Sequence, residues 1–201
     1  RSTMGQRCLG VPSPHSPQRV KTFVYLRQEV RTDKFEIRKV HRAAFMQPDE
    51  GKLVENLRNN EALTVSLVAI FEGKIVGHIA FSPVQIIEEG KVDRVVNGLG
   101  LAPLAVDPNH QGKGIGSSLV KGGIEACSEF NLDRKIPYEV IVVLGKPKFY
   151  SRFGFRPAEE FGIRWEHDCP KGAFQVLEIV EGGLGRTKGV VKYHQAFSEL
   201  S

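Results

Sequence analysis

The stretch that most constrains the fold runs from residue 99 to residue 117 and reads Leu-Gly-Leu-Ala-Pro-Leu-Ala-Val-Asp-Pro-Asn-His-Gln-Gly-Lys-Gly-Ile-Gly-Ser. Its apolar first half ends at Asp107-Pro108-Asn109, which is a strong turn signal. Apolar residues return at helical spacing after the glycines, so we predict a strand, a tight loop and a helix from about 112 to 130. The start of such a helix presents free backbone N–H groups to an anion, and glycines let the anion approach closely. We expect a binding loop for a phosphate ester.

The spacing of the glycines narrows the kind of phosphate ester. A Walker A loop is absent, and the dinucleotide fingerprint Gly-x-Gly-x-x-Gly fails from both possible starting glycines. The pattern that fits is Gln-x-x-Gly-x-Gly, formed by Gln111, Gly114 and Gly116. With the preceding strand, this resembles motif A of the Gcn5-related N-acetyltransferase (GNAT) superfamily, whose loop binds the pyrophosphate of acetyl-CoA. The alternative is that these glycines serve only the turn and the packing of the helix.

A second motif supports the resemblance, which covers roughly residues 22–198. The segment Phe-Tyr-Ser-Arg-Phe-Gly-Phe, residues 149–155, is similar to the family's Leu-Tyr-x-x-x-Gly-Phe. Together with Gly-His-Ile-Ala-Phe-Ser-Pro-Val at 77–84, it looks most like the YhbS-like branch of the superfamily. The chain departs from many members at Leu144, where they carry an asparagine. The asparagine contact to CoA is therefore not carried over.

Composition and length suit one soluble domain. The 201 residues are 41% hydrophobic and 25% charged, which is ordinary for a globular protein. Residues 1–21 are rich in Ser, Pro, Arg and Gln and contain no acid, so we expect a disordered leader or an added segment followed by a single domain at 22–198. Three unpaired cysteines favour a reducing, cytoplasmic location, although the acid-free leader also allows organellar targeting.

The order of predicted elements indicates an α/β (α+β) fold with a mixed, mainly antiparallel central sheet flanked by helices, as the resemblance implies. Pro103 inside the motif strand predicts an edge or a bulge. The elements that we predict are strands at 23–27, 64–71, 74–84, 92–96, 99–106, 138–144, 173–180 and 190–193, and helices at 32–45, 48–60, 112–130 and 148–153.

The resemblance implies direct attack of an amine on the thioester of acetyl-CoA in a ternary complex. The bulge at Pro103 would free strand-edge groups for the pantetheine amides. The loop amides would hold the pyrophosphate, and Lys113 would add positive charge. The expected cosubstrate-binding residues are Leu104, Ala105, Val106, Gln111, Gly112, Lys113, Gly114, Ile115, Gly116 and Ser117.

Two side chains are candidates for proton transfer. Tyr150 matches the position of the family's general acid and would donate a proton to the departing thiolate; the alternative is that it packs in an aromatic core. His78 is the best single candidate for a base, because imidazole titrates near neutrality, and its alternative is a sheet residue without a catalytic role. Further options are a carboxylate acting through water, from Glu88, Glu89 or Glu139, or no dedicated base, as in many members of the family. We expect Cys127 to pack in the core.

Three functions compete. The leading hypothesis is an acetyl-CoA-dependent N-acetyltransferase acting on an unidentified primary amine of a small molecule or a peptide. A GNAT-fold acyl-CoA-binding module without turnover is the second. A nucleic-acid-binding protein is the third and is disfavoured, because the net charge of +5 is modest and no basic aromatic stripe occurs. No metal site and no membrane span are expected, and a homodimer is compatible with the sequence. The acceptor would lie among residues 45–57, 83–98 and 154–174.

Overall fold

The computed structural model describes residues 23–46, 49–88, 90 and 95–198. Within them the chain forms one nine-stranded sheet whose main path runs β1-β2-β3-β4-β5-β8-β6, with β9 joining β7 to β3. The strands are β1 (Tyr25–Gln28), β2 (Val65–Phe71), β3 (Lys74–Ile87), β4 (Val95–Val106), β5 (Val140–Leu144), β6 (Arg156–Pro157), β7 (Ile163–Trp165), β8 (Phe174–Glu178) and β9 (Gly189–Lys192). The helices are α1 (Lys34–Phe45), α2 (Asp49–Asn59), α3 (Ile115–Leu132), α4 (Pro147–Tyr150) and α5 (Gly183–Arg186).

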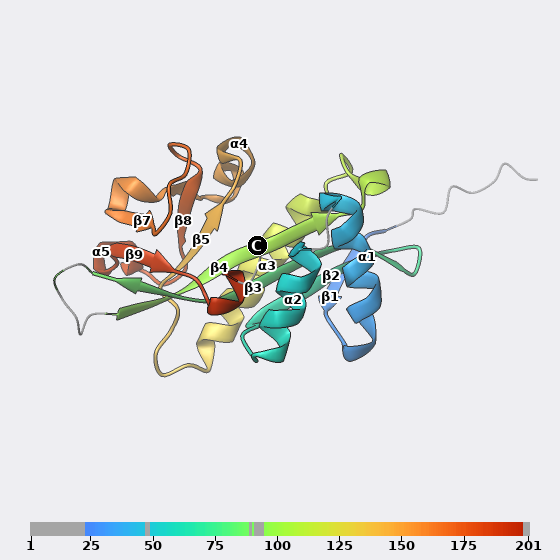
Figure 1. Cartoon of the computed structure of the whole chain (residues 1–201), viewed down its shortest axis with the longest axis horizontal. Helices are drawn as coiled ribbons and strands as arrows, with labels where there is room; N and C mark the ends of the chain where they lie inside the picture. The colour runs from blue at the N-terminus through green and yellow to red at the C-terminus, as the bar shows by residue number, and fades with distance from the viewer. Residues whose placement is uncertain (1–22, 47–48, 89, 91–94, 199–201) are drawn as a thin grey trace, which may run out of the picture.

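The helices cover both faces of the sheet, with α1 and α2 on one side and α3 on the other (Figure 1). Alternation along β3 sets the two faces, because successive side chains of a strand point to opposite sides. Ile79 and Phe81 pack with the apolar side of α3, whereas His78 contacts His41 of α1. Each face therefore has a core of its own, and the sheet between them is buried on both sides.

The pairing of the strands confirms the predicted mixed, mainly antiparallel sheet. Only β4–β5 and β7–β9 are parallel among the pairs of described strands. β1 to β4 form an antiparallel series, and β8 pairs antiparallel with both β5 and β6. The parallel β4–β5 pair is joined by α3, which packs on one face of the sheet, because two parallel strands need a crossover connection.

β4 is irregular near its middle, as Pro103 predicted. Ile79 of β3 pairs with Leu104 and Phe81 pairs with Leu101, so Ala80 alone faces the two residues Ala102 and Pro103. This is a β-bulge, and it bends the strand just beyond the point where β4 leaves β5. Proline fits there because it cannot donate to a ladder.

Several predicted bounds were wrong. The separate strands expected at 92–96 and 99–106 are one strand, β4, because the glycines at 98 and 100 are tolerated in its paired interior. Sequence patterns also missed β6, β7 and α5, which are two to four residues long and too short to show a period. The expected leader at 1–21 lies outside the described residues.

Candidate active site

The turn between β4 and α3 is built by local hydrogen bonds. The Asp107 carboxylate accepts from the N–H of Asn109 at 2.8 Å, and the Gln111 side chain donates to the carbonyl of Val106 at 3.0 Å. Gly112 and Gly114 have φ values of 74° and 83°, a region that favours glycine, and Gly114 is the N-cap of α3. The first N–H groups of α3 therefore point out of the helix with no side-chain cap.

These N–H groups open into a cavity of about 710 Å³, here called cavity 1. A Cβ atom on Gly112 or Gly114 would meet nothing within 4 Å, so both glycines leave their surroundings free for a ligand. The cavity is lined by Phe45, Leu104, Val106, His110, Gln111, Gly112, Gly114, Ile115, Gly116, Ser117, Gly145, Lys146, Phe149, Tyr150 and Arg152. Its charged lining is cationic, and with the dipole of α3 it suits a phosphorylated ligand.

Eight of the ten residues expected to bind the cosubstrate line cavity 1. The exceptions are Ala105 and Lys113. Ala105 is buried and pairs with His78, which places its side chain on the α1 side of the sheet. The Lys113 ammonium group donates to the carbonyl of Asn109 at 3.0 Å and stabilises the turn. The structure thus gathers the glycines and the end of β4, but it does not direct these two side chains into the cavity.

The Tyr150 side chain lies in the wall of cavity 1. Its ring packs edge-on against Phe149 and Phe155, with centroid distances of 4.9 and 5.7 Å. It also lies against Gly145, where an added Cβ atom would come within 2.5 Å of the ring. Burial raises the pKa of Tyr150 to about 12, so the phenol keeps its proton at neutral pH. This position is compatible with both roles that the sequence left open for Tyr150, a residue of an aromatic core and a proton donor.

β4 and β5 part beside Tyr150. Their ladder ends at the rung of Gly100 and Val142, so within the described residues the backbone of β4 that turns toward β5 beyond this rung has no strand partner. Two adjacent residues here line different cavities. Leu144, the last residue of β5, lines a second cavity, whereas Gly145, the next residue, lines cavity 1. The place where these two parallel strands separate therefore lies between the linings of two ligand-sized cavities.

The second cavity, called cavity 2, has a volume of about 520 Å³. It is lined by Leu101, Ala102, Leu144, Trp165, Glu166, His167, Tyr193, His194, Gln195, Phe197 and Ser198. The segment expected to form an acceptor pocket, 154–174, supplies three of these residues. Burial, and then the nearby Tyr150 phenol, raises the pKa of Tyr193 well above its usual value.

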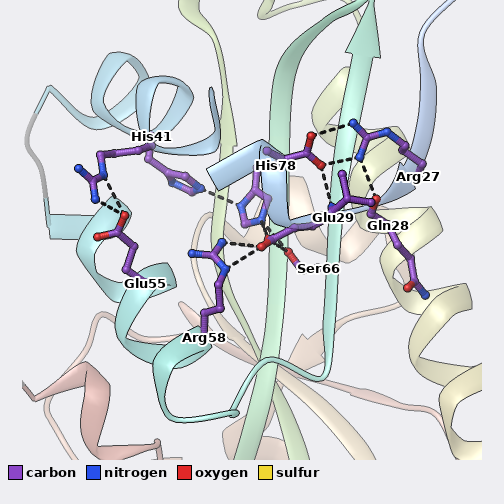
Figure 2. Close-up of polar contacts among 11 residues, drawn as sticks. Arg27, Gln28, Glu29, His41, Glu55, Arg58, Ser66 and His78 are labelled. Atoms are coloured by element: carbon purple, nitrogen blue, oxygen red, sulfur yellow. Dashed lines mark hydrogen bonds and ion pairs between the residues drawn. The ribbon is translucent and has the colours of Figure 1, made fainter. Parts of the chain in front are cut away.

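His78 lies in a buried network away from both cavities (Figure 2). His41 Nε2 and His78 Nδ1 are 2.8 Å apart, and His78 Nε2 is 2.9 Å from the Ser66 hydroxyl, which donates to Glu29 at 2.5 Å. Because Ser66 donates to Glu29, it accepts from His78 Nε2, and His78 Nδ1 then accepts from His41. Both imidazole nitrogens of His78 are engaged, so its position is structural and no acceptor amine can reach it.

The charges in this network follow from burial and pairing. Burial alone would raise the pKa of Glu29, but hydrogen bonds with His78 and Ser66 and the charge of Arg58 lower it to about 2. Burial, and to a smaller extent His78, lowers the pKa of His41 to about 3. The network therefore holds an ionised glutamate paired with Arg58, at 2.6 Å, beside neutral histidines at pH 7.

The remaining candidate bases do not line either cavity among the described residues. Glu139 lies at the other end of β5 and pairs with Arg186 at 2.6 Å. Glu88 follows the far end of β3, and Glu89 lies outside the described residues. Cys127 of α3 is fully buried in the core, and burial raises its thiol pKa.

Within the described part of the chain, no group of three or more His, Cys, Asp or Glu side chains could hold a metal ion. No helix there is long and apolar enough to cross a membrane.

The sequence did not reveal the cationic side chains that line cavity 1, or the aromatic side chains of Tyr193 and Phe197 that line cavity 2. Lys146 and Arg152 flank Tyr150, and Arg152 donates to the Ser117 hydroxyl at 3.3 Å across the mouth of the loop. Basic residues on both sides of the tyrosine were a usable signal. Tyr193 and Phe197 gave no signal, because only the pairing of β9 with β3 and β7 brings the end of the chain to β4.

Comparison with known proteins gives matches over most of the chain. A model of the acetyltransferase (GNAT) family matches residues 27–155. The chain is 36% identical over 176 residues to the uncharacterized N-acetyltransferase YhbS of Escherichia coli strain K12, covering 87% of this chain and 99% of that protein.

Two solved structures match the structure of this chain over most of its length. Escherichia coli YhbS in complex with CoA matches with a TM-score of 0.78 and 33% identity, covering 94% of this chain and 98% of that one. A GNAT family acetyltransferase from Brucella melitensis in complex with acetyl-CoA matches with a TM-score of 0.64 and 35% identity, covering 87% and 98%.

Proposed function

This chain belongs to the acetyltransferase (GNAT) family, and we propose that it transfers the acetyl group of acetyl-CoA to a primary amine by direct attack in a ternary complex. The observation that carries this proposal is the separation of β4 and β5 beyond Gly100, where neighbouring residues of the two strands line cavity 1, beside Tyr150, and cavity 2. A donor in one cavity and an acceptor in the other can meet there without a covalent enzyme intermediate.

The residues of cavity 1 fit acetyl-CoA. The open cradle at Gly112 and Gly114 and the start of α3 suit the pyrophosphate, and Lys146 and Arg152 add positive charge. The unpaired edge of β4 suits the pantetheine amides, which need strand-like hydrogen-bond partners. Relatives of this chain have been solved with CoA and with acetyl-CoA, which supports the same cosubstrate here.

The reaction forms one bond, breaks one bond and moves two protons, one to the departing sulfur and one away from the amine nitrogen. The amine nitrogen bonds to the acetyl carbonyl carbon, and the carbon–sulfur bond breaks. Tyr150 donates its phenolic proton to the departing sulfur, and the proton that the nitrogen loses passes through water and returns to the phenolate. The raised pKa of Tyr150 keeps it protonated until the sulfur leaves.

In our proposal, no dedicated base removes the proton from the acceptor amine. His78 is buried with both nitrogens engaged, and Glu139 pairs with Arg186 away from both cavities. An amine with a pKa near 10.4 is present as free base in only about one molecule in 10³ at pH 7, and this fraction is what reacts. The rate should therefore rise with pH as the acceptor loses its proton.

The experiment is release of free thiol from acetyl-CoA with a panel of amines, for the native chain and for Tyr150→Phe. We expect amine-dependent release, with kcat lowered on the order of 10²-fold in the variant and with little change in the KM for acetyl-CoA. Tyr138→Phe is the matched control, because Tyr138 is a buried tyrosine that lines neither cavity.

Three results would change this conclusion. Unchanged kcat in Tyr150→Phe would keep the enzyme and remove the tyrosine as acid. A similar loss in Tyr138→Phe would mean that the effect comes from packing. Saturable CoA binding without thiol release from any amine would point to a binding module.

A further inference from the structure

We infer that the acceptor is a small primary amine with a flat apolar body, in chemical terms an arylalkylamine, bound in cavity 2. The inference deepens the proposed function and rests on it, because it assumes that the acceptor enters from the side opposite acetyl-CoA. It is carried by the position of cavity 2, its aromatic wall, its size and its charges.

Cavity 2 lies next to the place where β4 and β5 separate. Leu101 and Ala102 are the first residues of β4 beyond the last rung shared with β5, and both line cavity 2. Leu144, the last residue of β5, lines it from the other strand. A ligand in cavity 2 therefore reaches the opening between the strands, where Tyr150 stands on the side of cavity 1.

The wall of cavity 2 is aromatic. Tyr193 lies between Phe197 and Trp165, with ring centroids 4.7 and 6.5 Å away. Its ring is pressed onto Gly100, where an added Cβ atom would come within 2.5 Å of it. Because the ring rests on the backbone of the last shared rung, the aromatic wall begins at the opening itself. Such a wall binds flat apolar groups and also accepts a cation against its ring faces.

Size and charge exclude other common acceptors. A space of about 520 Å³ is suited to a small molecule rather than a folded protein surface. Among the described residues, Glu166 is the only carboxylate of the lining and neither Lys nor Arg lines it, so these residues match one ammonium group but not several. A polyamine would lack partners for its further charges among the described residues of the lining.

Polar groups near the wall are already engaged or lie at the rim. His194 Nδ1 accepts from the N–H of Ala196 at 3.2 Å, which fixes the ring as the cap of the short turn Gln195–Phe197. Glu166 and His167 are exposed, which places them at the solvent side. An incoming ammonium ion would meet Glu166 before the amine is presented to the opening.

The chain offers a direct probe, because Trp165 is its single tryptophan and lines cavity 2. We would titrate the holoprotein, saturated with CoA, with phenethylamine, butylamine, spermidine, glucosamine and a lysine peptide while recording tryptophan fluorescence. The same amines would be used as acceptors with acetyl-CoA. We expect saturable fluorescence change with phenethylamine and a kcat/KM at least about tenfold above that of butylamine, the difference being burial of the ring.

Phe197→Leu tests the wall itself, since it keeps an apolar side chain but removes a ring. We expect the ratio of kcat/KM for phenethylamine to that for butylamine to fall severalfold, with the KM for acetyl-CoA unchanged. Phe130→Leu is the control, because Phe130 is exposed on α3 and lines neither cavity. The fluorescence titration reports binding in either variant even if turnover is slow.

The outcomes separate the inference from the proposed function. Equal or faster transfer to spermidine, glucosamine or the peptide would overturn the inference and keep the acetyltransferase. Saturable binding of phenethylamine at Trp165 with no thiol release from any amine would keep the site and overturn the activity. Neither binding nor release would overturn both.

Discussion

At the scale of single residues, the two buried side chains that the sequence offers for proton transfer lie in different surroundings. Tyr150 lines cavity 1 and keeps its proton because burial raises its pKa to about 12. His78 titrates near neutrality in water, but the strand that carries it is buried on both faces, and its two nitrogens bond to His41 and Ser66. The identity of a residue suggested chemistry for both, and only its surroundings separate them.

The buried histidines should make the protein sensitive to acid. The pKa of His41 is lowered from 6.5 to about 3 in the folded chain, so between these values the unfolded chain binds a proton that the folded chain does not. Stability is therefore fully present above pH 6.5 and is lost as the pH falls toward 3. Each such group should steepen the loss by about 1.4 kcal/mol per pH unit.

Urea unfolding at pH 7, 6 and 5, values chosen above and below the ordinary pKa of about 6.5, measures this slope. His41→Gln removes one titrating group, so we expect a shallower slope than in the native chain by about one proton. Its absolute stability at pH 7 will also differ, and only the slope is diagnostic. His167→Gln at the exposed rim of cavity 2 should leave the slope as it is. Equal slopes in the native chain and His41→Gln would contradict the buried neutral histidine.

At the scale of elements, the site is made by the way β4 and β5 separate. Pro103, with the bulge around it, and the end of the β4–β5 ladder at Gly100 leave the edge of β4 open. The sequence predicted this bulge, the glycine loop and α3, because proline, a turn signal and helical spacing are local features. It did not predict β6, β7 or cavity 2, because these depend on pairing between segments far apart in the chain.

Gly145, which directly follows β5, should control the position of the Tyr150 ring, our proposed general acid. A Cβ atom there would come within 2.5 Å of Tyr150, while the backbone is not in the left-handed region, so Gly145→Ala displaces the ring without backbone strain. We expect kcat for acetyl transfer to fall on the order of 10²-fold with the circular dichroism spectrum retained. Gly185→Ala is the matched control, because its added methyl would meet nothing within 4 Å. Undiminished kcat in Gly145→Ala would show that the ring position is not critical.

At the scale of the whole molecule, two ligand-sized cavities lie beside the place where β4 and β5 separate. Cavity 1 is cationic at its loop and suits a large anionic cosubstrate, and cavity 2 is aromatic and suits a small amine. The family and the fold were readable from two motifs, because those motifs bind the part of the ligand that family members share. The proposed acceptor site could not be predicted from the sequence, since cavity 2 is assembled from β4, β5, β7 and the last residues of the described chain.

The central claim is that an acetyl group passes from thioester to amine where β4 and β5 separate. The most direct measurement uses acetyl-CoA labelled in the acetyl group, mixed with the protein and phenethylamine, followed by quantification of labelled amide and free thiol by mass spectrometry. We predict equal amounts of both, no acetylated protein, and a matching loss of both products in Tyr150→Phe. Thiol released without labelled amide from any amine, or CoA bound with neither product formed, would contradict the account.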